Sequence, residues 1–500
     1  MLAAALMTGA AAGACSASLN FIECSDDAEC NTRFPSDGPL RCQTGVCVLA
    51  ECKGHGECSS LGESYACGVD GLCIDVATDA CELLHVPGGE IVDEVVFVGA
   101  IYDQKAADGP EIRAAIKLAV EEFNSKTTLT NGSGVALIGC DAGKSVEGAL
   151  SAARHLGETV GAPALIGPAD DEEFVAVVEK VSNKSGNLIF TISPTAIAPF
   201  ADAPDWVWLS SPAVDFYGQA MIDRIAGYQV KTGVMVFSGD NYGIGLRNAI
   251  SVDNGMGGLV IPNVADQVNL SYDAVNTDGT EALSLLLEGI AEPELVVLIG
   301  GDEVGAQIKF LAGLVSARPK KILITRKSVR AVQAALLDLA DPDLAGRIEL
   351  VSPDATDPTV AAAVQGRILA KNSSLNAIGE SANLAYDAAM TTLLALRALK
   401  SSEPIAGPQI GQKIKRLTEG MTVSFDDDSL AFITAAASEF DLGRNVDLAG
   451  ASGGLGYNDV VHATCGPFVL WKYDPASSAP VPSASYATNC PAKGGVWADL

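Results

Sequence analysis

The stretch PALIGPADDEEFVAVVEKVSNKSGNLIFTISPTAIAPF, residues 163–200, decides the fold. A short apolar run, PALIG, precedes a helical pattern, EEFVAVVEKVSN, and a second apolar run, NLIFTIS, follows. Both runs are continuously apolar and do not alternate with polar residues, which is typical of strands covered on both faces. The stretch therefore predicts two parallel strands that are connected by a helix.

The same strand-then-helix unit recurs along the chain from Val95 to about Lys400. Further apolar runs are VVFVGAI, VALIG, GVMVFSG, LVVLIGG, KKILIT and RIELVS. This many parallel strands favour two doubly wound sheets over one, and such sheets place ligands at the carboxyl ends of their strands. In the first helix, one face is apolar, and the residues expected to point largely outward are Glu111, Arg113, Lys117 and Glu122.

One unit contains a glycine-lysine turn that resembles a nucleotide-binding loop. In ALIGCDAGKSVEGALSAARHL, residues 136–156, Gly139 and Gly143 bracket only three residues. A P-loop needs four, so that successive backbone N–H groups can surround the phosphate. The sequence therefore predicts a βα unit here and no nucleotide site.

Composition narrows the class of protein. The 500 residues are 48% hydrophobic, enough for two or three packed cores. The 32 Lys and Arg against 62 Asp and Glu give a formal charge of −30, which argues against a nucleic-acid partner. No stretch beyond the first residues is apolar for long enough to span a membrane.

Cysteines cluster near the N-terminus, as in exported proteins that rely on disulfides. Two Gly-, Ser- and Asp-rich segments carry four each, with spacings C-x5-C-x11-C-x4-C and C-x5-C-x8-C-x5-C. Both are too poor in apolar residues to fold without cross-links, so we expect two disulfide modules acting as a spacer. These eight are Cys24, Cys30, Cys42, Cys47, Cys52, Cys58, Cys67 and Cys73. A zinc site formed by these cysteines is the weaker interpretation, because no C-x2-C pair is present and His55 is the only histidine in the two segments.

Four other cysteines, Cys81, Cys140, Cys465 and Cys490, allow three pairings, of which Cys465 with Cys490 is the first expectation. The N-terminal MLAAALMTGAAAGA ends at Cys15 and resembles a bacterial lipoprotein signal peptide, although no Lys or Arg precedes the apolar run. Lipidation of Cys15 would tether the chain to a membrane. The alternative is an ordinary cleaved signal peptide with Cys15 left over.

The order of the strand-and-helix units resembles the type I periplasmic binding proteins, in the leucine/isoleucine/valine-binding branch. Residues 163–200 carry the strongest match, a strand ending in Ile-Gly-Pro, then a helix, then a strand leading into Ser-Pro-x-Ala. Weaker matches are GPEIRAAIKLAVEEFN, MVFSGDNYGIGLRNAI, ANLAYDAAMTTLLAL and GASGGLGYND. The resemblance spans about residues 92–475 and implies two α/β lobes joined by three crossovers, closing on a small polar solute delivered to an ABC permease.

The resemblance also implies where the solute binds. The first lobe offers the loop after Gly167 and the loop from Ser193 to Ile197, whose backbone N–H groups could hold a carboxylate. The second lobe offers strand-end residues. The candidate ligand-binding residues are Asp171, Ser193, Thr195, Ala196, Tyr242, Asp302, Arg326 and Lys327.

Four residues in these loops depart from the amino-acid-binding pattern of the family. Asp171 stands where amino-acid binders tend to have serine, Ile197 where they tend to have threonine, and Arg326-Lys327 near their acidic residue. An anionic Asp171 would repel a ligand carboxylate, and the basic pair would repel an amine. We therefore expect a ligand of altered or reversed polarity, or one that is not an α-amino acid.

The sequence predicts an α/β fold of two doubly wound lobes after a disulfide-rich segment. The expected boundaries are 1–19 for the signal peptide and tether, 20–81 for the Cys modules, 92–213 with about 345–420 for lobe 1, 214–344 with about 421–475 for lobe 2, and 476–500 for a tail. The expected location is periplasmic or cell-surface, with no cofactor and no metal.

Three alternative interpretations of the function remain open. An enzyme is disfavoured because the four histidines form no H-E-x-x-H motif, no G-x-S-x-G is present, and adjacent carboxylates such as Asp170-Asp171 are usually solvated. A surface-anchored recognition lipoprotein that kept the fold but not the transport role is the main alternative. A eukaryotic receptor ectodomain is less favoured.

Overall fold

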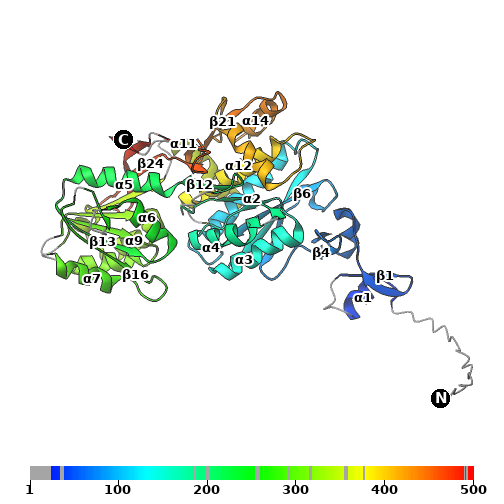
Figure 1. The fold of residues 1–500 in the computed structure, drawn as a ribbon, viewed down its shortest axis with the longest axis horizontal. Coiled ribbons are helices and arrows are strands. Elements are labelled where there is room, and N and C mark those ends of the chain that lie inside the picture. Colours follow the sequence, from blue (N-terminus) through cyan, green and yellow to red (C-terminus); the bar gives the residue numbers. More distant parts are fainter. Residues whose placement is uncertain are drawn as a thin grey trace, which may run out of the picture.

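The computed structural model describes residues 24–33, 39–184, 186–197, 203–253, 259–262, 264–290, 293–314, 318–353, 358–375, 378–426, 428–488, 490 and 494–500. Cys15 and the segment 1–19 lie outside the described residues. Two lobes, each built on its own sheet, lie side by side in Figure 1, with the Cys modules at the far side of lobe 1 from lobe 2.

The sheet of lobe 1 has the strand order β23-β12-β11-β8-β6-β7-β5. All neighbouring strands pair in parallel except β5 with β7 at one edge, which confirms the prediction from the continuously apolar runs. The strands are β5 (Cys81–His85), β6 (Val95–Tyr102), β7 (Gly134–Asp141), β8 (Ala164–Ile166), β11 (Phe190–Ser193), β12 (Val207–Pro212) and β23 (Ala463–Thr464).

Helices and two small extra sheets, β10-β9 and β20-β21-β22, complete lobe 1. Helices α2 (Gly109–Lys126) and α12 (Glu380–Arg397) pack against each other and share one apolar core with the sheet. The other elements of this lobe are α3 (Val146–Arg154), η3 (His155–Val160), α4 (Asp171–Val177), η4 (Val178–Ser182), β9 (Asn183–Lys184), β10 (Asn187–Leu188), α11 (Pro358–Lys371), α13 (Gly407–Lys413), η6 (Ile414–Leu417), β20 (Met421–Ser424), α14 (Ala431–Asp441), β21 (Val446–Gly450) and β22 (Gly453–Gly454).

The sheet of lobe 2 has the order β16-β13-β17-β18-β19-β24-β25-β26, parallel as far as β19 and antiparallel beyond it. Its strands are β13 (Thr232–Ser238), β16 (Asp266–Tyr272), β17 (Leu295–Ile299), β18 (Lys321–Thr325), β19 (Ile348–Pro353), β24 (Phe468–Tyr473), β25 (Pro480–Thr488) and β26 (Gly495–Asp499). Its other elements are α5 (Val214–Tyr228), α6 (Asn241–Ala249), β14 (Val252–Asp253), β15 (Leu259–Val260), α7 (Thr280–Gly289), α8 (Val304–Gly313), η5 (Arg326–Ser328), α9 (Val329–Leu339) and α10 (Pro342–Ala345).

The chain crosses between the lobes three times, after β12, after β19 and after β23. The first crossing lies where the sequence predicts it, but the other two lie later. The strand β19 belongs to lobe 2 and not to lobe 1, and residues 421–464 belong to lobe 1 and not to lobe 2. Residues 480–499 are no separate tail, because β25 and β26 extend the sheet of lobe 2. Apolar strands show that a sheet exists, but not which of two similar sheets a strand joins.

Two acidic residues predicted to point outward are buried. Glu111 and Glu122 of α2 are only 3% and 7% exposed. Glu122 pairs with Arg367 at 2.9 Å and also accepts a hydrogen bond from the hydroxyl of Tyr386. The helix is therefore covered on its polar face as well, by cations and hydroxyls from distant segments.

The aspartate of the sequence Ala-Tyr-Asp-Ala joins α12 to the turn between β21 and β22. Asp387 is fully buried, and its carboxylate accepts hydrogen bonds from Ala451 N (2.8 Å), Ser452 N (2.7 Å) and Ser452 Oγ (2.6 Å). Burial outweighs these hydrogen bonds and raises the pKa of Asp387 to about 6. A Cβ on Gly450 would lie 2.6 Å from the same carboxylate, so only glycine fits there.

The cysteine modules have the same disulfide connectivity, first with third and second with fourth. The pairs are Cys24–Cys42, Cys30–Cys47, Cys52–Cys67 and Cys58–Cys73. The predicted disulfide modules are thereby confirmed. Their elements are α1 (Asp27–Arg33), β1 (Leu40–Gln43) and β2 (Val46–Leu49) in the first, and η1 (His55–Leu61), β3 (Tyr65–Cys67) and β4 (Cys73–Asp75) in the second, with η2 (Pro87–Gly89) leading into lobe 1.

The second module is docked on lobe 1. The N–H of Val69 donates to Thr159 O at 3.1 Å, and the ring of His55 meets that of Phe97 edge-on at 5.0 Å. Beyond the module, Cys81 of β5 is disulfide-bonded to Cys140, its direct partner on β7. The expected Cys465–Cys490 bond is also present. Among the described residues, no helix is both long and apolar enough to cross a membrane.

Candidate ligand-binding site between the lobes

Two loops at the carboxyl ends of lobe 1 strands are tied to each other by side-chain hydrogen bonds. Ser193 Oγ donates to Pro168 O (2.6 Å) and Thr195 Oγ1 donates to Ala169 O (2.7 Å). Gly167 turns the chain at φ 99°, and a Cβ there would lie 2.1 Å from Ile101 O. The Ile-Gly-Pro sequence therefore fixes where the first loop leaves the sheet.

The backbone N–H groups expected to hold a ligand carboxylate already have acceptors within the chain. Ile197 N donates to Asp171 Oδ1 at 2.8 Å, and Ala196 N donates to Ser193 Oγ at 3.1 Å. Asp171 is 1% exposed. Its carboxylate therefore lies where the resemblance to the binding proteins implies a ligand carboxylate.

A basic segment of lobe 2 faces these loops from the end of β18. Arg326 and Lys327 lie in η5, and Arg330 lies one turn further along in α9. Each of the three contacts a carbonyl or carboxylate of lobe 1. We call Arg326, Lys327 and Arg330 the basic segment.

Lys327 lies close to two carboxylates of lobe 1. Its Nζ lies 3.0 Å from Asp171 Oδ2, 3.4 Å from Asp170 Oδ2 and 4.3 Å from the centre of the Tyr242 ring. Tyr242 is 1% exposed and lies in the first turn of α6 in lobe 2. Burial alone would lower the pKa of Lys327, but the carboxylates of Asp171, Asp170 and Asp240 outweigh it and raise that pKa. Lys327 is therefore an ammonium ion held by both lobes.

Arg326 is buried at the same interface. Its Nη2 donates to Thr195 O, its Nη1 lies 3.9 Å from Glu380 Oε1, and its backbone N donates to the hydroxyl of Tyr217 at 3.1 Å. Its Nε has no hydrogen-bond partner among the described residues, although the residue is only 5% exposed. Nη1 also lacks a hydrogen-bond partner among those residues, so two donor nitrogens of a buried cation are unused at this interface.

Arg330 and Glu111 form a third link between the lobes. Arg330 Nη2 lies 2.7 Å from Glu111 Oε2, and Arg330 Nη1 donates to Ala107 O. Glu111 also accepts a hydrogen bond from Gly379 N at 3.0 Å. Burial raises the pKa of Glu111, and the charge of Arg330 opposes this.

Further carboxyl groups lie close to Lys327 in lobe 1. Asp103 and Glu173 are 8% and 4% exposed and hydrogen-bond to each other. Burial, the charges of Asp103 and Asp170 and that hydrogen bond raise the pKa of Glu173 to about 8. Burial also raises the pKa of Asp103, whose carboxylate accepts from Lys144 N at 2.5 Å. At neutral pH Asp103 and Glu173 therefore share a proton. The backbone N–H groups of the Gly143-Lys144 turn donate to carboxylates, namely those of Asp141 and Asp103.

The structure brings together seven of the eight predicted site residues, namely Asp171, Ser193, Thr195, Ala196, Tyr242, Arg326 and Lys327. The eighth, Asp302, is exposed in the turn between β17 and α8. Glu111, Arg330, Asp103 and Glu173 were not predicted, because a buried charge is recognisable only from its partner, and these partners lie far apart in sequence.

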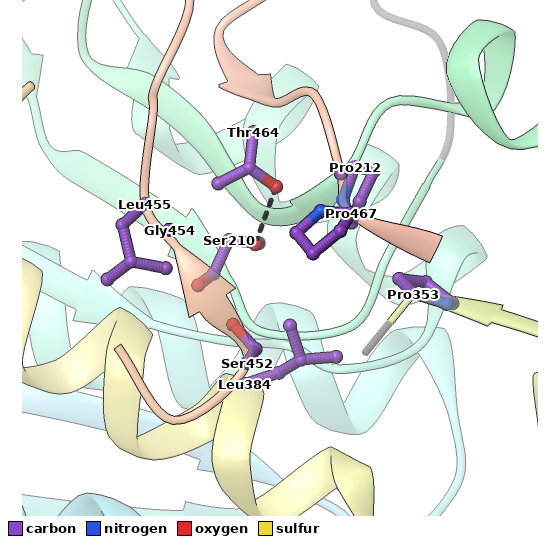
Figure 2. A pocket seen from close by; sticks show the side chains of 10 residues that line it. Ser210, Pro212, Pro353, Leu384, Ser452, Gly454, Leu455, Thr464 and Pro467 are labelled. Carbon is purple, nitrogen blue, oxygen red and sulfur yellow. Dashed lines mark hydrogen bonds between the residues drawn. The ribbon is translucent and has the colours of Figure 1, made fainter. Parts of the chain in front are cut away.

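A small pocket lies where the crossovers pass between the lobes (Figure 2). It is lined by residues of all three crossings, among them Ser210, Pro353 and Thr464, and its volume is about 10 Å³. The hydroxyl of Thr464 donates to Ser210 O at 3.1 Å. The space suits one water molecule and no solute.

A second, open hollow of about 430 Å³ lies between the second Cys module and lobe 1. Its polar groups are paired within the chain: Asp93 accepts from Gly56 N (2.8 Å), Glu57 from Lys53 N (2.8 Å) and His55 Nδ1 from Cys67 N (3.2 Å). The groups of cysteines close enough to share a metal ion are those already joined in disulfides, so the weaker zinc reading has no thiolates in the described modules.

Comparison with solved structures shows the same two-lobe architecture in other proteins. The substrate binding protein LivJ of a branched-chain amino acid transporter from Streptococcus pneumoniae, solved with isoleucine, matches with a TM-score of 0.58 and 16% identity over 81% of this chain and 100% of its own. The leucine-binding protein LivK of Thermotoga maritima matches with a TM-score of 0.58 and 18% identity over 78% and 98%. This chain has the periplasmic binding protein fold of type I.

A periplasmic binding protein type 1 from Bordetella pertussis matches equally well, with a TM-score of 0.59 and 16% identity over 78% of this chain and 99% of its own. The resemblance drawn from the sequence is thus confirmed for the fold. No protein-family model and no curated protein matches the chain.

Proposed function

We propose that this protein is an extracytoplasmic solute-binding protein of an ABC-type importer, which binds a small polar, amino-acid-like solute between its lobes. The observation that carries the proposal is the meeting of polar groups from the strand ends of both lobes, with the Asp171 carboxylate and the Thr195 carbonyl on one side and Arg326, Lys327 and Tyr242 on the other. A solute contacting both lobes binds the closed state more tightly than the open one, and so favours closure.

The similar solved structures support this class of function. They are described as substrate-binding or leucine-binding proteins, and one of them holds isoleucine. No catalytic step is part of the proposal. Its location outside the cytoplasm agrees with the disulfides, which persist in oxidising compartments. Anchoring through a lipid on Cys15 belongs to the proposal as well, and fatty-acid labelling of the chain and its Cys15→Ser variant tests it.

A thermal-shift screen of the purified protein tests the function. The panel contains amino acids, small carboxylates, polyamines, sugars and peptides. A ligand at about a hundred times its Kd adds about 2.7 kcal/mol to the stability of the folded state, which is a measurable rise in Tm. Substituting Thr195 or Tyr242 should then weaken the response to the same ligand. Absence of any response across the panel contradicts the proposal.

A second candidate function is surface recognition without transport. It is favoured by one observation: the charged groups of the lobe interface are already paired with each other, so closure of the lobes does not depend on a solute. The disulfide modules, of which the second is docked on lobe 1, would then present a contact surface. A permease gene beside the gene for this protein favours import, and its absence favours recognition.

A further inference from the structure

Lys327 enters lobe 1 from lobe 2 as an ammonium ion among carboxylates. Its side chain is 23% exposed, and the carboxylate it approaches most closely, that of Asp171, is 1% exposed. Its Nζ also lies close to the carboxylate of Asp170 and the ring of Tyr242, and the charge of Asp240 acts on it as well. Carboxylates and an aromatic face are the groups that recognise an amine.

The carboxylate that pairs with Lys327 has a second partner in lobe 1. Asp171 Oδ1 accepts from Ile197 N, while Oδ2 pairs with Lys327. Asp171 and Lys327 together therefore supply, from the chain itself, one carboxylate bound to a backbone N–H and one ammonium bound over an aromatic ring. These are the two charged groups that a zwitterionic solute would bring.

We propose that Lys327 is a tethered occupant of the amine position in the lobe interface, which holds the lobes together and which a cationic group of an external ligand must displace. Arg326 and Arg330 strengthen the same closure through Thr195 O and Glu111. The inference deepens the proposed function, since it assigns the ligand an amine or another cationic group. Its test does not need the natural solute.

The test removes the tethered ammonium and replaces it from solution. In Lys327→Ala the carboxylates of Asp170 and Asp171 lose their cation, and the space of the lysine stem is vacated. Butylammonium chloride should then raise the Tm of the variant, by about 1–2 °C at several times its Kd, relative to sodium chloride at equal ionic strength. The uncharged isostere 1-butanol should not do so, and the wild-type protein should show no comparable rise.

Lys321 offers a matched control. Its Nζ lies 3.0 Å from Glu349 Oε1, as close as Lys327 lies to Asp171, but both partners belong to lobe 2. Lys321→Ala should therefore leave the lobe interface intact, and any rescue by butylammonium should be weaker than in Lys327→Ala. Circular dichroism shows whether each variant is folded.

A second variant covers the case in which Lys327→Ala fails to fold. Lys327→Met keeps most of the apolar stem of the side chain and removes the ammonium group, and should show an increased radius of gyration by small-angle scattering, whereas Lys321→Met should not. Equal butylammonium responses in wild type, Lys327→Ala and Lys321→Ala overturn the inference, as does a Lys327→Met variant with the scattering profile of the wild type. A failed solute screen alone would affect only the proposed function.

Discussion

Glu111 in α2 and Arg330 in α9 belong to different lobes, and their Oε2 and Nη2 atoms lie 2.7 Å apart. Glu111 is 3% exposed, whereas the side chain of Arg330 is 42% exposed. The acid therefore depends on this cation, and on Gly379 N, to remain charged at the interface.

Arg330→Met should destabilise the protein at neutral pH by about 1–2 kcal/mol, less than a fully buried pair because Arg330 is partly exposed. Without Arg330 the pKa of Glu111 rises further, so protonation at low pH should restore part of the lost stability. Denaturant unfolding at pH 7.5 and pH 4.5 measures both effects. Arg347→Met, which breaks an exposed pair with Asp343 within lobe 2, is the control. An equal, pH-independent loss in both variants would contradict this account.

Glu173 should make the stability of the protein fall as the pH rises. Its folded-state pKa of about 8 lies above the ordinary glutamate pKa of 4.5, so its stabilising contribution is complete below pH 4.5 and is lost as the pH rises through 8. Glu173→Gln can still donate to Asp103 and does not ionise. The variant should gain stability relative to wild type between pH 5 and pH 9, which parallel urea titrations at the two pH values measure. A difference that does not change with pH refutes the assignment.

Asp387→Ala should destabilise lobe 1 by about 3 kcal/mol, because it leaves buried N–H donors of Ala451 and Ser452 without an acceptor. Gly450→Ala should also destabilise it, since the added Cβ would lie 2.6 Å from the Asp387 carboxylate. The double variant should lose less than the sum, because the clash disappears with the carboxylate. Gly454→Ala is the control, since a Cβ there meets nothing within 4 Å. Strict additivity in denaturant unfolding would argue against the contact.

Cys81→Ala/Cys140→Ala should release β5 from the edge of the lobe 1 sheet. This disulfide spans 59 residues and Cys465–Cys490 spans 25. In the chain-entropy model the two contribute about 4 and about 3.5 kcal/mol. Limited proteolysis should cut between the second module and β6 in the first double variant, but not in Cys465→Ala/Cys490→Ala. Cleavage at the same rate in both would show that the disulfide does not secure the module.

The parallel strands could be predicted from sequence because burial on both faces makes a strand apolar throughout, as in β6, β17 and β18. The assignment of β20 and β21 to a lobe could not. Their residues are compatible with either lobe, and the choice follows from packing of the segment 421–464 against α2 and α12 of lobe 1.

Seven of the eight residues predicted for the site meet at the lobe interface, but how they pair was not predicted. The resemblance to binding proteins pointed to Asp171 and Lys327 separately, as residues that would repel a ligand's carboxylate and amine. The ion pair between them explains both departures, because each charge is the partner of the other. Helical periodicity placed Glu111 on a polar face correctly, but that face is covered by Arg330, which lies 219 residues further along the chain.

Small-angle scattering of the wild-type chain and of Lys327→Met/Arg330→Met tests most directly whether the lobes close on each other through these contacts. We expect the wild-type protein to be compact without added solute. The double variant should have a larger radius of gyration, and should become compact again when a stabilising ligand from the screen is added. Identical profiles for the two proteins would mean that the lobes do not separate, and would contradict binding by two-lobe closure.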